Sequence, residues 1–217
     1  MKTITLTVSA AKDLDALPRD ARNQVEEGLS RYAVTGYGDV KRLQGRDGFR
    51  LRIGSYRVIF DEDATTILAI YIGRRATTTY KRRRPTRGIE MTEPQIIRTP
   101  GGEELVVLSR DEYDSLRARA DSAAEDEDDV AIYDARRAEL ASGGAMLPAA
   151  VSASMLRGDS RLKAIRQWKD VTQLHLASRT GISQGYLADL ESGRRTGTAE
   201  TLAKLADALG VPVSWLS

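Results

Sequence analysis

The 217-residue chain carries 33 Lys and Arg against 31 Asp and Glu, and 41% of its residues are hydrophobic. It has no cysteine and a single histidine, His175, which excludes disulfides, thiolate nucleophiles, zinc–thiolate sites and histidine acid–base pairs. No apolar run approaches the roughly 20 residues that cross a membrane, and the first residues lack the apolar core of a signal peptide. We expect a cytoplasmic protein that uses no metal and no cofactor.

The net charge of +2 conceals three blocks of alternating sign. Residues 1–90 hold 18 Lys and Arg against 11 Asp and Glu, a net of +7. Residues 91–150 hold 6 against 14, a net of −8, and residues 151–217 hold 9 against 6, a net of +3. A basic module suits polyanions, and an acidic segment beside it is suited to cover that surface. We interpret the change of sign at Met91 as the junction of two adjacent gene products in one chain.

The basic block predicts a small α+β unit. Ile4, Leu6 and Val8 alternate with threonines, as in a half-buried strand. The pattern then predicts helices over residues 10–17 and 18–31 and antiparallel strands over residues 49–53, 56–61 and 66–72. The helices would bury one apolar stripe, made of Leu14, Leu17, Ala21, Val25 and Leu29.

Alternation along these strands places arginines on one face of the predicted sheet. Arg50 and Arg52 share a face of their strand, Arg57 of the next strand can join them, and Arg75 and Tyr80 follow the last strand. Such a basic wall suits phosphates through bidentate guanidinium contacts and an unpaired base through stacking on tyrosine. Arginines are also ordinary on the solvent face of a sheet, so the pattern alone leaves both interpretations open.

The segments KRLQG at 41–45, FRLRIGSYRVIF at 49–60 and IGRR at 72–75, with Tyr80, resemble the RelE/ParE toxin superfamily over nearly all of residues 1–82. The resemblance implies either ribosome-dependent cleavage of messenger RNA or inhibition of DNA gyrase. For cleavage it implies that Arg57 holds the scissile phosphate and that Arg75 assists the leaving oxygen. It also places Arg50 and Arg52 where RelE has catalytic lysines, and Tyr80 near the C-terminal tyrosine of that family.

The arginines at the two lysine positions bear on the chemistry. Attack by a ribose 2′-hydroxyl needs a proton acceptor, a proton donor and stabilisation of charge on the phosphate. Arginine is effectively never deprotonated, so Arg50 and Arg52 suit charge stabilisation and not general base catalysis. Proton transfer would then fall to the ribosome or to Tyr80. The sequence favours an mRNA endoribonuclease and keeps a ParE-type gyrase inhibitor as the alternative.

The acidic block predicts a hairpin and two helices. Two short strands flank the Pro-Gly-Gly turn at 100–102, and Ser109 with Glu112 forms a capping box at the start of the first helix. A second helix is expected from the acidic run at 123–129 to Leu140. The hairpin and first helix resemble the N-terminal part of Phd-like antitoxins, although a solvated linker helix would give the same pattern. Beside the basic block, we expect this segment to cover the toxin through Tyr113, Asp128, Asp129, Ile132, Tyr133 and Leu140.

The last block predicts a helix-turn-helix. Leu162, Ile165 and Trp168 mark one helix. A second helix runs from Thr172 to Arg179, with Leu174, Leu176 and Ala177 inward, a turn at Gly181 and a third helix from Gln184 to Glu191. A fourth helix spans 199–209. A plain four- or five-helix bundle is the alternative.

Residues 159–216 closely resemble Xre/Cro-type DNA-binding domains, in which the second helix of the motif enters the major groove. The resemblance implies that Gln173 anchors a phosphate, that Ser183 caps the recognition helix, and that Gln184, Tyr186 and Asp189 point toward base edges. Gln184 suits adenine and Asp189 suits cytosine. Arg194 and Arg195 would hold the DNA backbone.

Together these patterns predict a type II toxin–antitoxin pair in one chain. Its ranges would be a RelE/ParE-like toxin at 1–84, a junction at 85–94, a covering segment at 95–150 and a helix-turn-helix domain at 157–217. The second half would be a HigA-like antitoxin that dimerises and represses its own promoter. Expected partners are mRNA on the ribosome, operator DNA, and the toxin face of the same chain or of an exchanged chain. The remaining alternative is a DNA-binding regulator whose first domain is a non-catalytic interaction module.

Overall fold

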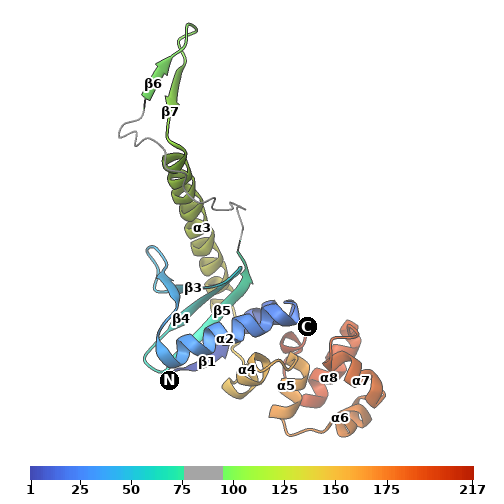
Figure 1. Cartoon of the computed structure of the whole chain (residues 1–217). Coiled ribbons are helices and arrows are strands. Elements are labelled where there is room, and N and C mark those ends of the chain that lie inside the picture. The colour runs from blue at the N-terminus through green and yellow to red at the C-terminus, as the bar shows by residue number, and fades with distance from the viewer. Residues whose placement is uncertain (76–94) are drawn as a thin grey trace. The chain divides into compact units, whose positions relative to one another are not determined.

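The computed structural model describes residues 1–75 and 95–217, which belong to two compact units (Figure 1). One unit comprises Met1–Arg75 and Asp129–Ser217, and the other spans Ala76–Asp128. The division falls within the long helix α3 (Arg110–Ala141), so each part of that helix is described with its own unit. Tyr80 and the junction at Met91 lie outside the described residues. The predicted ranges 1–84, 85–94, 95–150 and 157–217 differ from these two units, and they stay a prediction.

The first unit contains a mixed five-stranded sheet of order β1-β5-β4-β3-β2, in which β1 is parallel to β5 and the other neighbours are antiparallel. Its strands are β1 (Thr3–Leu6), β2 (Asp39–Arg42), β3 (Phe49–Ile53), β4 (Tyr56–Glu62) and β5 (Thr66–Arg74). The three predicted antiparallel strands are confirmed as β3, β4 and β5. The edge strand β2 was not predicted, because a single apolar residue, Val40, gives it no alternation to detect.

Two helices cover one face of this sheet: α1 (Val8–Asp15) and α2 (Arg19–Thr35). The placement of Val8 in the first strand was wrong, because the Thr7 hydroxyl accepts a hydrogen bond from the backbone N–H of Ala10 at 3.0 Å and starts α1 there. The expected stripe is confirmed, with Leu14, Val25 and Leu29 fully buried. The α+β class expected for this region is therefore observed.

The free edge of β1 pairs with residues 145–147, which follow α3 in the chain. The N–H of Leu147 donates to the carbonyl of Leu6 and the N–H of Val8 donates to that of Ala145, both at 2.9 Å. Helix α4 (Ala149–Leu156) follows, and the hydroxyl of its Ser152 accepts from the N–H of Leu6 at 3.0 Å. The sequence analysis predicted no helix or strand for residues 145–156. Residues 145–156 thus complete the sheet and its core.

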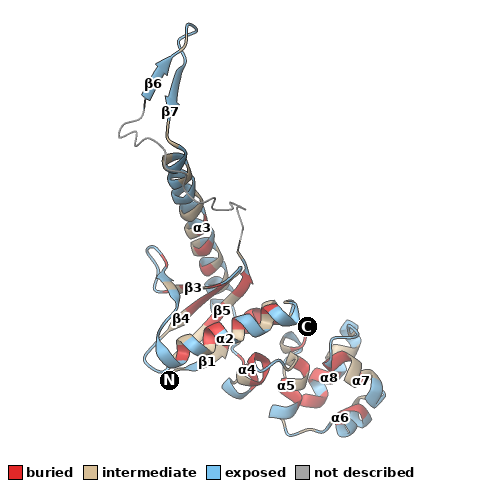
Figure 2. Ribbon diagram, in the orientation of Figure 1, coloured by how far each residue is buried: buried red, intermediate tan, exposed pale blue. Residues whose placement is uncertain are grey.

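The C-terminal part is all helical: α5 (Arg161–Trp168), α6 (Gln173–Thr180), α7 (Gln184–Glu191), α8 (Ala199–Leu209) and the 3-10 turn η1 (Val213–Trp215). Its buried residues join those of the sheet in one continuous apolar cluster (Figure 2). The inward placement of Leu174 was wrong, since its side chain is 67% exposed. Two residues along a helix turn by about 200°, so Leu174 faces away from the buried Leu176.

The second unit holds a two-stranded hairpin, β6 (Gln95–Arg98) with β7 (Glu104–Val107), and the first part of α3. The predicted capping box is confirmed: Ser109 Oγ accepts from the N–H of Glu112 at 3.2 Å, and a Glu112 oxygen accepts from the N–H of Ser109 at 2.8 Å. Where two helices were expected, α3 is continuous from Arg110 to Ala141. It contains no glycine or proline, and a run of acidic residues does not interrupt a helix. Among the described helices, none is long and apolar enough to cross a membrane.

Candidate functional site

The arginines singled out in the sequence lie on the sheet face opposite α1 and α2. Arg52 and Arg57 are direct partners across β3 and β4, and Arg50 stands two residues from Arg52 on the same side. This face is closed to solvent over Arg50 and Arg57, whose residues are 2% and 5% exposed. The Arg57 guanidinium also lies 5.9 Å from the ring centroid of Tyr71. We call Arg50, Arg52 and Arg57 the arginine face.

Asp129, the first α3 residue of this unit, neutralises the centre of the arginine face. One carboxylate oxygen lies 2.7 Å from Nη1 of Arg50, and the other lies 2.7 Å from Nη1 of Arg57. The Asp129 side chain is fully buried. Because a buried charge is tolerated only when it is paired, two guanidiniums and one carboxylate here depend on each other.

Helix α3 is also held by polar contacts around this centre. The Asp134 carboxylate accepts two hydrogen bonds from Arg46, both at 2.6 Å, and these bonds hold the pKa of Asp134 below its ordinary value. The Tyr133 hydroxyl donates to Asp61 at 3.0 Å, and Arg137 lies 3.2 Å from the same carboxylate. Burial, followed by the bond to Asp61, raises the pKa of Tyr133 to about 12.

Apolar side chains also pack between α3 and the sheet. Leu43, Ile59 and Ile70 of the sheet form a buried cluster with Tyr133, and further α3 residues pack against it: Val130, Ile132 and Leu140. The Tyr133 ring lies so close to the backbone at Gly48 that a Cβ there would stand 2.2 Å from a ring carbon. Glycine at this position therefore allows the helix to approach the sheet.

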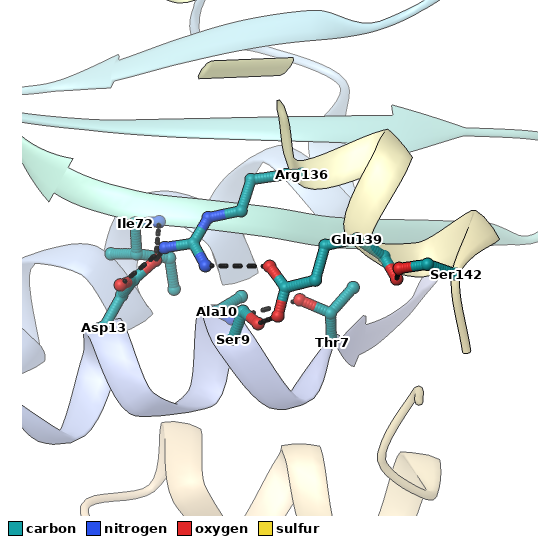
Figure 3. A network of polar contacts seen from close by, with 8 residues as sticks. All are labelled: Thr7, Ser9, Ala10, Asp13, Ile72, Arg136, Glu139 and Ser142. Carbon is teal, nitrogen blue, oxygen red and sulfur yellow. Dashed lines mark hydrogen bonds and ion pairs between the residues drawn. The ribbon is translucent and has the colours of Figure 1, made fainter. Parts of the chain in front are cut away.

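The end of α3 is fixed to α1 by a second polar network (Figure 3). Arg136 donates to both oxygens of Asp13 at 3.0 Å and lies 3.2 Å from Glu139, which accepts a hydrogen bond from the Ser9 hydroxyl. Burial raises the pKa of Asp13 although Arg136 opposes the shift. The bond from Ser9 lowers the pKa of Glu139. Contacts on both sides of α3 thus hold its last turns against the sheet and α1.

The expected residues are only partly brought together. Asp129, Ile132, Tyr133 and Leu140 lie with the arginine face, whereas Tyr113 and Asp128 belong to the second unit. Arg75 follows β5, and its N–H donates to the carbonyl of Ser55 at 2.9 Å. Sequence reasoning missed the contacts of Arg46, Asp61, Asp134, Arg136 and Arg137. The three- and four-residue spacing of 129, 133, 136 and 140 was a signal for one buried helix face.

The second candidate site is the start of α7 in the helix-turn-helix. Ser183 caps this helix by accepting from the N–H of Tyr186 at 3.2 Å, and Gln184 and Gly185 are exposed at its first turn. Tyr186 is half-buried, and the Arg195 guanidinium lies 5.7 Å from its ring centroid. An exposed amide at the first turn of the helix is suited to reach a base edge.

A buried ion pair joins α7 of this motif to α5. Arg166 of α5 donates to both oxygens of Glu191 in α7, at 2.6 and 3.0 Å, and to the carbonyl of Val171 at 2.7 Å. The amide of Gln173 donates to the same Glu191 carboxylate at 2.8 Å. Gln173, at the start of α6, is therefore oriented by the end of α7.

Asp189 makes ion pairs within the domain. Its carboxylate accepts from Nε of Arg194 at 2.8 Å and lies 3.6 Å from Nε of Arg195. These contacts hold both arginines beside α7. Within the described residues, no group of His, Asp and Glu is arranged to hold a metal ion.

Comparison with known proteins identifies the family of the C-terminal helical domain. Residues 162–216 match a helix-turn-helix family. The chain is 44% identical over 54 residues to the immunity repressor protein of Bacillus phage phi105, a stretch that covers 25% of this chain and 38% of that protein. It is 48% identical over 52 residues to an uncharacterized HTH-type transcriptional regulator of Sinorhizobium fredii, covering 24% of this chain and 68% of that protein. The chain therefore belongs to the helix-turn-helix family through its C-terminal domain.

Proposed function

We propose that this chain is a toxin–antitoxin unit in one polypeptide, with a RelE/ParE-like catalytic face on the sheet that α3 keeps closed. The observation that carries the proposal is Asp129, whose buried carboxylate lies 2.7 Å from both Arg50 and Arg57. A carboxylate and a phosphate oxygen make the same charge-assisted hydrogen bonds to guanidinium. Asp129 thus occupies the groups that would receive the phosphate of an RNA substrate.

In this proposal the arginine face cleaves messenger RNA on the ribosome once α3 has left it. Arg57 holds the scissile phosphate, Arg50 and Arg52 stabilise the charge that develops on it, and Arg75 assists the leaving oxygen. Tyr80 or the ribosome transfers the proton. Because the covering helix is in the same chain, its effective concentration is high and the toxin is silent in this state.

The helix-turn-helix domain binds operator DNA and represses its own promoter in this proposal. Its similarity to a phage immunity repressor supports a repressor role. Gln173 anchors a phosphate, Gln184 and Tyr186 meet base edges, and Arg194 and Arg195 contact the backbone. Asp189 reads a base only if it releases Arg194. A dimer is expected, because helices of this kind commonly read paired half-sites.

The toxin half is tested in the full chain, because residues 145–156 complete the sheet and a truncated toxin would lack them. Asp129→Ala combined with Tyr133→Ala should loosen α3 and arrest growth when expressed in bacteria. Mapping of message 3′ ends in the arrested cells should show new cleavage sites. The matched control carries Arg57→Ala and Arg75→Ala in addition and should grow normally. Arrest that persists in this control would refute phosphate handling by the arginine face.

A gyrase inhibitor is the second candidate, and the arginine face favours it in one respect. Arg50 and Arg52 provide charge but no proton acceptor, so the face lacks a complete nuclease set. Plasmid supercoiling measured in the same arrested cells separates the two functions. Loss of supercoiling with intact messages identifies the gyrase inhibitor. Normal growth of the loosened variant, with its altered α3 docking demonstrated, identifies a non-catalytic interaction domain instead.

The repressor half is tested by gel shift of the purified chain on a fragment from upstream of its own gene. Gln184→Ala removes a base-edge contact and should weaken specific binding by roughly 1–3 kcal/mol. Lys204→Ala is the matched control, because Lys204 pairs with Glu200 on α8 outside the motif. Equal affinity for the fragment and for unrelated DNA in the unmodified chain would contradict operator recognition.

A further inference from the structure

An open groove in the first unit lies away from the arginine face and borders the helix-turn-helix at Glu191 and Arg195. It has a volume of about 830 Å³ and is bordered by α1, α2, α5 and the turn between α7 and α8. Its wall carries five arginines: Arg19, Arg22, Arg157, Arg161 and Arg195. Three carboxylates accompany them, so the groove is lined by an excess of positive charge. In Figure 1 the C-terminus of the chain lies near one end of α2, which is the neighbourhood of this groove.

Two of the three carboxylates are engaged with partners that do not line the groove. Glu191 is held by Arg166 at 2.6 Å, and Asp159 pairs with Lys163 at 2.6 Å. The third carboxylate, Asp15, is shared by two arginines at longer distances, 3.4 Å from Arg22 and 3.6 Å from Arg161. Five arginines therefore line the groove, of which Arg22 and Arg161 share Asp15, and Arg195 lies 3.6 Å from Asp189 outside the groove.

Single nitrogen atoms of two of these guanidinium groups lack an acceptor, although Arg22 donates to the carbonyl of Asp15 and Arg161 to that of Leu216. Nη1 of Arg161 and Nε of Arg22 are buried and have no hydrogen-bond partner among the described residues. Arg19 and Arg157 are exposed, and neither forms an ion pair with a described residue. Burial lowers the pKa of Arg161 and raises that of Asp15, so Asp15 does not fully compensate the charge beside it. The exposed side chains of Arg19 and Arg157 are open to an anion in the groove, and the charges of Arg22 and Arg161 lie beside it.

The local backbone adds to the positive potential. The first turns of α2 and α5 both border the groove, through Arg19 and Arg22 in one helix and Ser160 and Arg161 in the other. Helix N-termini favour anions because their N–H groups and dipoles point outward. The remaining wall combines polar residues with four leucines, at 162, 190, 202 and 216. A wall that combines guanidiniums with leucines suits a ligand that has both a phosphate and an apolar ring.

We infer that this groove is a binding site for a phosphate-bearing small molecule of about nucleotide size. The phosphate lies among Arg19, Arg157 and Arg161, and the ring lies against the leucine wall. The volume is in the range of roughly 300–1,000 Å³ that small-molecule sites occupy. Since the groove joins α1 and α2 to the helix-turn-helix, a bound ligand links these two parts. The site does not depend on the toxin assignment, because no residue of the arginine face lines it.

The test is isothermal titration and thermal unfolding of the full chain with inorganic phosphate, AMP, ATP and adenosine. We expect one site per chain and, at saturation, a rise in Tm of roughly 5 °C or more with at least one phosphate-bearing probe. Binding of nucleotides without binding of inorganic phosphate assigns the leucine wall to a base. Equal affinity for inorganic phosphate and for the nucleotides assigns the site to phosphate alone. Adenosine binding as tightly as AMP overturns the role of the arginines.

Variants of the lining residues test whether the ligand binds in this groove. Arg161 is buried and its loss can unfold the domain, so the test variant is the exposed pair Arg19→Gln with Arg157→Gln. It should bind the phosphate-bearing probe at least tenfold more weakly while keeping its circular dichroism spectrum. The matched control Lys204→Gln, on the exposed surface of α8, should bind as the unmodified chain does. Absence of binding to all probes, or unchanged binding by the double variant, overturns the proposal. Loss of affinity for duplex DNA by that variant, without any small-molecule binding, assigns these arginines to the DNA backbone and overturns it as well.

Discussion

The two parts of α3 lie in different environments. In the second unit the helix exposes apolar side chains, and Tyr113 is 45% exposed. In the first unit Tyr133 is 6% exposed, and Asp129 is completely buried. Figure 2 shows buried residues in this part of α3. Both parts contain Asp, Glu and Arg, but residues 129–141 hold four of the six large apolar side chains of α3: Val130, Ile132, Tyr133 and Leu140. The comparison teaches that apolar side chains distinguish the part that packs, and that the arginine face makes a buried carboxylate within that part tolerable.

The largest effect is expected from Asp129→Ala. It removes the buried carboxylate that lies 2.7 Å from both Arg50 and Arg57, and breaking a buried ion pair costs about 3–5 kcal/mol. Urea unfolding of the full chain, followed by tryptophan fluorescence and circular dichroism, measures this loss. Asp128→Ala changes the neighbouring exposed carboxylate and should stay within about 0.5 kcal/mol of the unmodified chain. Equal losses for the two variants would show that burial beside arginine is not the cause.

Tyr133→Ala and Tyr113→Ala should show the next largest difference in unfolding free energy. Tyr133→Ala removes a buried ring that packs with Leu43, Ile59 and Ile70, and we expect a cost of about 3 kcal/mol. Tyr113→Ala removes a ring that is about half exposed and should cost less than about 1 kcal/mol. The measurement is the same urea titration. A cost for Tyr113→Ala close to that for Tyr133→Ala would mean that the first part of α3 is packed in solution.

The hydroxyl of Tyr133 contributes a smaller, pH-dependent part. Tyr133→Phe loses the bond to Asp61 and should cost about 1 kcal/mol at neutral pH. The pKa of Tyr133 is raised from 10.0 to about 12 in the folded chain, so the stability that its neutral hydroxyl provides is complete below pH 10. This contribution is lost as the pH rises through about 12.

Comparing the unmodified chain with Tyr133→Phe isolates the contribution of the Tyr133 hydroxyl. The pKa of Tyr32, which hydrogen-bonds to Glu62, is also raised to about 12, and both chains retain it. Unfolding free energy measured from pH 8 to pH 12 should therefore fall more steeply for the unmodified chain than for Tyr133→Phe. Parallel curves would assign the alkaline loss to Tyr32 and to other groups.

Periodicity predicted most of the fold and only part of the site. The strands β3, β4 and β5, the capping box and the helix-turn-helix follow from local patterns, since apolar spacing and cap residues act within a few positions. The addition of residues 145–147 to β1 could not be predicted, because it depends on a long-range edge pairing. In the site, alternation placed Arg50, Arg52 and Arg57 on one face. It could not determine which carboxylate meets them, because that depends on how α3 approaches the sheet over Gly48.

The smallest effect is expected from Asp134→Asn, which sharpens the contrast with Asp129. Asp134 has two hydrogen bonds from Arg46 at 2.6 Å, as good a geometry as Asp129 has, but about half of its side chain is exposed. Water and salt screen such a pair, so its loss should cost less than Tyr133→Phe and become smaller still at high salt. Since Arg46 lowers the pKa of Asp134, this contribution is complete above its ordinary pKa and is lost as the pH falls through the lowered one. Urea titrations at pH 7 in low and high salt, and again near pH 3, measure it. A cost for Asp134→Asn as large as that for Asp129→Ala would mean that contact geometry, and not burial beside two arginines, holds α3 on the sheet.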